Sequence, residues 1–79
     1  MDNRGYSLQI VRANEQADPS SIGVLLGRAC IKKDIPVAEV ATFFGVSRMT
    51  IYSWFSGAGK PRKLMEEKIR AVLDKLGDA

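Results

Sequence analysis

The 79-residue chain contains no histidine and a single cysteine, and both scarcities limit its chemistry. Without histidine it lacks the commonest general base, the partner of most serine and cysteine nucleophiles, and the usual ligand of catalytic zinc. Cys30 has no second cysteine to pair with, so no disulfide forms within the chain, which fits a reducing cytosol. Its neighbours are alanine and isoleucine, and burial among them would raise the pKa of the thiol. We therefore expect Cys30 in the core, no enzymatic activity, and neither a cofactor nor a metal site.

The chain also lacks a long apolar run. Its uninterrupted hydrophobic stretches are a few residues long, far below the roughly 20 that span a bilayer. The first residues, Met-Asp-Asn-Arg-Gly, have neither the basic start nor the apolar centre of a signal peptide. We therefore expect one small domain that stays in the cytoplasm and does not enter a membrane. The formal net charge of +3 indicates an anionic partner without identifying it.

Three prolines divide most of the chain into helical segments. Each precedes a stretch whose apolar residues recur every three or four positions, and proline suits the first turn of a helix. The predicted helices run from about Pro19 to Lys33, from Pro36 to Gly45, from Ser47 to Gly57 and from Pro61 to Gly77. Asp18 is the expected N-cap of the first. The fold class is therefore all-α, a compact bundle of four to five helices containing a helix-turn-helix.

The first 17 residues carry two patterns. Tyr6, Leu8 and Ile10 alternate as in a strand, whereas Tyr6, Ile10, Ala13 and Ala17 fit a helix equally well. We predict an extended arm or short strand for residues 1–17, laid on a helix-turn-helix domain of residues 18–79.

The stretch from residue 37 to residue 56 carries the clearest motif. Two short helices that cross steeply need a small residue, a turn glycine and apolar anchors around the crossing. Ala41 is the small residue, Gly45 forms the turn, Val46 fills the corner, and Ser47 can cap the second helix. The expected anchors in the core are Val40, Phe44, Ile51 and Trp54.

This motif resembles the helix-turn-helix of the lambda-type phage repressor and Cro family of DNA-binding proteins. The positions that carry the resemblance are Ala41, Gly45, Val46, Ser47, Ile51 and Trp54. It extends over roughly residues 20–76 and includes a basic, glycine-containing loop after the second motif helix. The resemblance implies a small phage or bacterial transcription regulator, such as a repressor, that binds an operator in double-stranded DNA as a homodimer and occludes or recruits RNA polymerase. Such a protein works in the bacterial cytoplasm, which is the host cytoplasm for a phage-encoded protein.

The family's groove-facing positions correspond here to Ser47, Arg48, Met49, Tyr52 and Ser53. We expect base contacts from the last four, because they lie opposite Ile51 and Trp54 on a helix. Arginine suits guanine, whose O6 and N7 accept both arms of the guanidinium. The expected phosphate contacts are Ser47, Lys60, Arg62 and Lys63. Pro36 and Val37 depart from the family, which usually has a capping Ser or Thr followed by Gln there.

A second interpretation treats the helix-turn-helix as an assembly or protein-interaction module. Examples are the recognition subunit of a phage DNA-packaging machine and a small binder of a host factor. A net charge of +3 is modest for a DNA-binding protein, and Met49, Tyr52 and Phe55 could form a protein-binding face. Binding to random duplex at low salt separates the two interpretations.

Two surfaces are candidates for pairing between copies. We favour the final helix through Leu64, or the loop before it, because the resembling family pairs there. The competing surface is the N-terminal arm, through Tyr6, Leu8 and Ile10.

Overall fold

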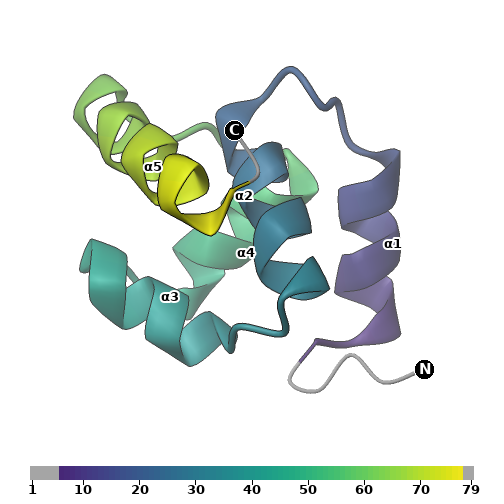
Figure 1. Ribbon diagram of the computed structural model, residues 1–79. Helices are drawn as coiled ribbons and strands as arrows, with labels where there is room; N and C mark the ends of the chain where they lie inside the picture. Colours follow the sequence, from purple (N-terminus) through teal and green to yellow (C-terminus); the bar gives the residue numbers. More distant parts are fainter. Residues whose placement is uncertain (1–5, 78–79) are drawn as a thin grey trace.

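The computed structural model describes residues 6–77 and contains five helices and, within these residues, no strand (Figure 1). The helices are α1 (Leu8–Gln16), α2 (Ile22–Lys32), α3 (Val37–Phe44), α4 (Arg48–Ser56) and α5 (Lys63–Leu76). The predicted all-α bundle is confirmed, and so is a helix after each proline. None of these five helices combines the length and the apolarity that crossing a membrane requires.

Residues 8–16 are helical, so the expectation of an extended arm or short strand is wrong for them. The side chain of Ser7 caps α1 by accepting a hydrogen bond from the backbone N–H of Ile10. Val11 and Asn14 are buried and lie three residues apart, so they share the face that meets the core. The alternating apolar residues at positions 6, 8 and 10 form too short a run to reveal the true period. Residues 1–5 of the predicted arm lie outside the described residues.

Buried contacts join α1 to the rest of the bundle. The Tyr6 hydroxyl donates a hydrogen bond to the carbonyl oxygen of Ile35, and its ring stacks on Phe55 at 6.2 Å between centroids. The Asn14 amide donates to the carbonyl oxygens of Val24, at 3.1 Å, and Phe55, at 2.7 Å. Because these partners belong to α2, α4 and the linker between α2 and α3, α1 is part of the same core as the other helices.

The connection from α1 to α2 also differs from the expectation. Ser21 occupies the N-cap position of α2, so the helix begins three residues after Pro19 and not at it. Asp18 forms a turn, in which its side chain accepts a hydrogen bond from the backbone N–H of Ser20 at 2.9 Å. Arg28 of α2 closes the other side of this connection. Its guanidinium donates to the carbonyl oxygens of Asn14, Glu15 and Ala17, at 3.2–3.4 Å.

Helix α2 lies at the centre of the bundle and packs against α1, α4 and α5. The glycines of α2 permit this close packing. A Cβ atom at Gly27 would lie 2.5 Å from the Asn14 amide nitrogen and 2.8 Å from the Phe55 ring. Cys30, on the same helix, is buried as expected, and burial raises the pKa of its thiol to about 12. The thiol is therefore a core group that stays protonated at neutral pH.

Candidate nucleic-acid interface

Helices α3 and α4 are joined by a short turn whose hydrogen bonds end one helix and start the next. Gly45 adopts the left-handed conformation, with φ of 70°, which favours glycine over any residue with a Cβ atom. The N–H of Val46 donates to the carbonyl oxygen of Ala41, and that of Gly45 to Thr42. The Ser47 hydroxyl accepts from the N–H of Thr50 at 3.2 Å and caps α4. The predicted turn and cap are therefore confirmed.

The crossing of α3 and α4 is filled by the side chains expected there. Trp54 and Ala41 are 5% and 6% exposed, and Ile51 is fully buried. The Phe44 ring meets the Trp54 ring edge-on, at 5.8 Å between centroids. Val40 is also buried, and Val46 packs against the core from the turn. These contacts fix how α4 is presented at the surface.

The outer side of α4 carries the four residues predicted to contact bases, in two different environments. Arg48 and Met49, in the first turn, are exposed, and Met49 is 77% exposed. Tyr52 and Ser53 are half-buried. Tyr52 packs against the core, and the Ser53 hydroxyl lies so close to Gly59 that a Cβ there would be 2.5 Å away. The first turn of α4 is thus the more accessible part of the predicted site.

The loop after α4 brings the basic cluster to the same side of the molecule. Pro61 is buried and anchors the loop, whereas Lys60, Arg62 and Lys63 are all exposed. The N–H of Gly59 donates to the carbonyl oxygen of Ser53 at 3.1 Å, which holds the loop against α4. Leu64, the next residue of α5, is 83% exposed.

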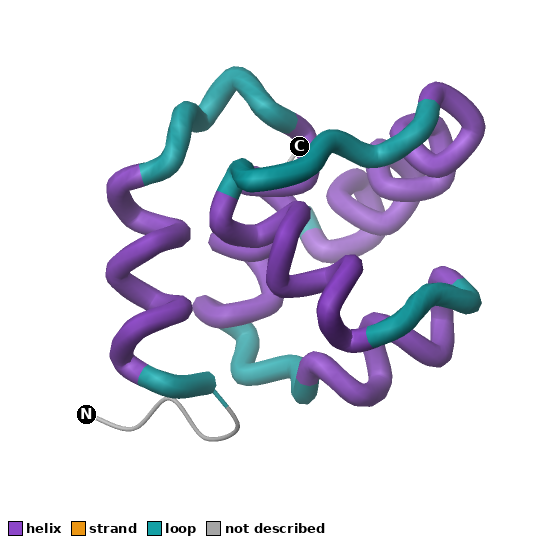
Figure 2. Tube along the Cα trace, turned by 180° about the vertical axis from the view of Figure 1, so that it is seen from behind, coloured by secondary structure: helices purple, strands orange, loops and turns teal. Residues whose placement is uncertain are grey.

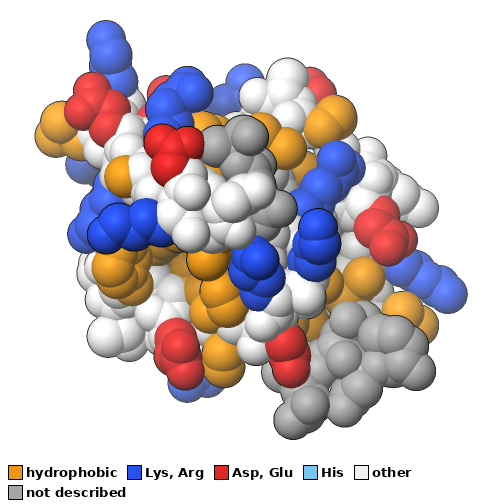
Figure 3. All heavy atoms as spheres, viewed as in Figure 1, with side chains coloured by type: hydrophobic (Ala, Val, Ile, Leu, Met, Phe, Trp, Pro, Cys, Tyr) orange, Lys and Arg blue, Asp and Glu red, His pale blue; other side chains and the backbone are white. Residues whose placement is uncertain are grey.

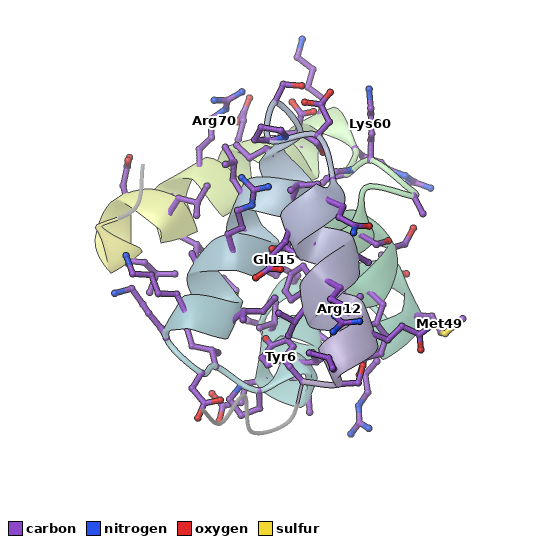
Figure 4. All side chains as sticks on the ribbon, turned by 90° about the vertical axis from the view of Figure 1, so that its right-hand side faces the viewer. Tyr6, Arg12, Glu15, Met49, Lys60 and Arg70 are labelled. Atoms are coloured by element: carbon purple, nitrogen blue, oxygen red, sulfur yellow. The ribbon has the colours of Figure 1, made fainter. Side chains whose placement is uncertain are left out.

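Two views locate this surface. In Figure 2, α4 and residues 57–62 face the viewer, and the loop crosses the end of α4 toward the start of α5. In Figure 4, Met49 projects to the right, on the side where α4 lies, and Lys60 projects upward from the loop, where it lines one pocket with Arg70 of α5. We call the exposed residues Ser47, Arg48, Met49, Lys60, Arg62 and Lys63 the α4 face.

Comparison of the chain with protein-family models, with curated proteins and with solved structures gave no match. Within residues 6–77, no group of three or more Cys, Asp or Glu side chains is placed to hold a metal ion. The α4 face is therefore interpreted from its own residues.

Sequence reasoning missed the contribution of α1 to this site. Tyr6 stacks on Phe55, and Asn14 bonds to the carbonyl oxygen of the same residue, so α1 supports α4 from behind. A Ser at position 7 followed by apolar positions three and four residues apart was the available signal, but the strand pattern matched it equally.

Proposed function

We propose that the chain is a sequence-specific double-stranded DNA-binding protein, a small phage or bacterial regulator that acts in the cytoplasm. The observation that carries the proposal is the joint exposure of Arg48 and Met49 at the start of α4 and of three cations between the other end of this helix and the start of α5. A helix that presents its first turn in this way fits the major groove, and flanking cations fit the phosphates on either side. Bound at an operator, such a protein occludes or recruits RNA polymerase.

Each side chain of the α4 face has a role that its chemistry supports. Arg48 reads guanine, because its guanidinium can bond O6 and N7 together. Met49 offers apolar contact to a thymine methyl group, and the hydroxyl groups of Tyr52 and Ser53 complete the base-contacting set. A cation in the first turn opposes the helix dipole, at a cost of about 0.3–1 kcal/mol, and contact with DNA offsets that cost.

Phosphate binding falls to Ser47 and the loop. Lys60, Arg62 and Lys63 place three positive charges within four residues, next to a helix start where no carboxylate precedes Glu66. Such contacts fix the register of a protein on DNA without reading sequence. They also make affinity depend on salt, since each neutralised phosphate releases counterions.

Alanine substitution distinguishes residues that contact bases from residues that contact phosphates. On a site selected from random DNA, Arg48→Ala should weaken binding by about 1–3 kcal/mol and relax the preference at one base pair. Lys63→Ala should weaken all sequences alike and reduce the slope of log affinity against log salt by about one. Fluorescence anisotropy over a salt series measures both quantities, with Arg12→Ala, which removes an exposed cation of α1 outside the α4 face, as the control.

Two results would count against this scheme. A uniform loss of affinity in both variants would make Arg48 a further phosphate contact. Absence of binding to any duplex at low salt would remove the DNA-binding proposal itself.

We further propose that two copies occupy one site. One recognition helix reads too few base pairs to discriminate within a genome, so pairing on a pseudo-palindromic site is expected. The two helices bearing Arg48 would then lie about 34 Å apart, one turn of DNA. Leu64 at the start of α5 is the pairing surface, because it is exposed and borders the α4 face.

Sedimentation on the selected DNA should give two chains per site, and Leu64→Ser should reduce this to one chain with weaker binding. One wild-type chain per site with full specificity would contradict pairing. On the competing N-terminal surface, Leu8 is 61% exposed, whereas Tyr6 is buried and Ile10 packs against the core. Removing residues 1–16 would therefore expose the core and is not a usable test.

The second candidate function remains a protein-interaction or assembly module. The observation that favours it is the exposure of Met49 and Leu64, two large apolar side chains, within or beside the α4 face. Under this alternative, random duplex does not bind at low salt, and Met49→Ser weakens a protein complex.

A further inference from the structure

A second surface lies on the side of the molecule opposite to α4. Helix α3 packs on α4 and helix α5 packs on α2, which leaves a groove between α3 and α5 of about 730 Å³. Leu26 and Cys30 of α2 form its buried floor. Its walls are mainly apolar and include Ile35, Phe43, Val72 and Leu76. Figure 3 shows hydrophobic side chains exposed between α5 and α3, with basic side chains bordering them above and acidic ones below.

Phe43 stands out on the edge of this groove because it is 57% exposed. The Lys68 ammonium holds this edge in place: it donates to the carbonyl oxygen of Phe43 at 3.2 Å and lies 5.1 Å from the ring centroid. The ring is therefore fixed at the surface with much of its apolar area in water. One molecule thus offers both a protruding aromatic ring and an apolar groove able to receive one.

The charges of the groove are arranged in the same self-complementary way. Glu39 lies on the α3 wall and Lys75 on the α5 wall, and within residues 6–77 no ion pair joins them. A two-fold axis that runs along the groove places the α3 wall of each copy against the α5 wall of the other. Each Glu39 then faces the Lys75 of the other copy, and the contact occurs twice. Opposite charges on opposite walls are what an isologous contact requires.

We propose that this groove binds a second copy of the same chain, in a two-fold pair that forms without DNA. The Phe43 ring of each copy enters the groove of the other, and two Glu39–Lys75 pairs fix the register. The inference does not depend on the proposed function, because the groove and the α4 face lie on opposite sides (Figures 1 and 2). Should the α4 face bind DNA as proposed, the pair would direct two such faces apart and could hold two duplexes together.

Sedimentation velocity of the full chain without DNA tests the pair. A small interface of this kind associates weakly, so the concentration series should extend to about 0.5 mM. Wild-type protein should shift from monomer to dimer within it. Glu39→Lys and Lys75→Glu should each weaken association at least about tenfold, because each puts like charges opposite one another twice.

The decisive sample is an equimolar mixture of the two variants. In a mixed pair, the two substituted positions face each other with their charges exchanged, so one contact again joins a lysine to a glutamate. The other contact joins the unchanged Lys75 of the first variant to the unchanged Glu39 of the second, and association should return to the wild-type level. Glu67→Lys makes the same change in net charge as Glu39→Lys, but on α5 outside the groove, and should leave association unchanged. Thermal melts at low concentration establish that each variant is folded.

Three results would overturn the proposal. If the wild-type chain stays monomeric over the whole concentration series, the groove does not bind a second copy, and its ligand is an apolar peptide or a small molecule. Association that Glu39→Lys does not weaken belongs to another surface, and Leu64→Ser tests the surface beside the α4 face. If association is weak in both variants and stays weak in their mixture, the two reciprocal ion pairs between Glu39 and Lys75 do not form.

Discussion

Replacing Trp54 by alanine lowers the free energy of unfolding by about 3–5 kcal/mol, as large-to-small changes in a core do. Its ring is 5% exposed and packs edge-on against Phe44, so the change empties the crossing of α3 and α4. A chain of this length has a total stability of only about 4–12 kcal/mol. The melting temperature should therefore fall by at least about 12 °C, or folding should be lost, as followed by circular dichroism.

Matched variants show that the effect belongs to the crossing. Met49→Ala removes a large side chain from the same helix, but Met49 is 77% exposed, and the melting temperature should change little. Trp54→Phe keeps an aromatic ring and should retain much of the lost stability. A shift of one or two degrees for Trp54→Ala would contradict the assignment of this residue to the core.

Replacing Asn14 by alanine should cost about 3 kcal/mol, the upper part of the range for a lost partner in a buried hydrogen-bond pair. The Asn14 side chain is 2% exposed and its amide bonds to the carbonyl oxygens of Val24 and Phe55, so the substitution removes one hydrogen bond to α2 and one to α4. Hydrogen exchange should show faster opening of α1 than of α4, and a thermal melt gives the total loss.

Gln16→Ala is the matched control, because Gln16 is an exposed amide side chain on the same helix. Its melting temperature should stay near that of the wild type. If Asn14→Ala behaves like Gln16→Ala, the two hydrogen bonds contribute little, and α1 is held by Tyr6 and Arg28.

The local sequence determined where most helices begin and end. Gly45 and the Ser47 hydroxyl act within a few residues of their own position, through the left-handed backbone and a bond to the N–H of Thr50. The apolar spacing also identified the residues at the crossing of α3 and α4, because it fixes which side of a helix they share. The same spacing placed Arg48 and Met49 on the exposed side of α4.

Only the tertiary structure decided the features that depend on residues far apart in the chain. α1 joins the core through Tyr6 and Asn14, which reach partners 29 and 41 residues away, at Ile35 and Phe55, and no local pattern reveals such partners. The role of Arg28, which closes the end of α1, has the same origin. The groove between α3 and α5 exists because these helices pack on different neighbours, and periodicity gives the apolar side of each helix but not the surface that covers it.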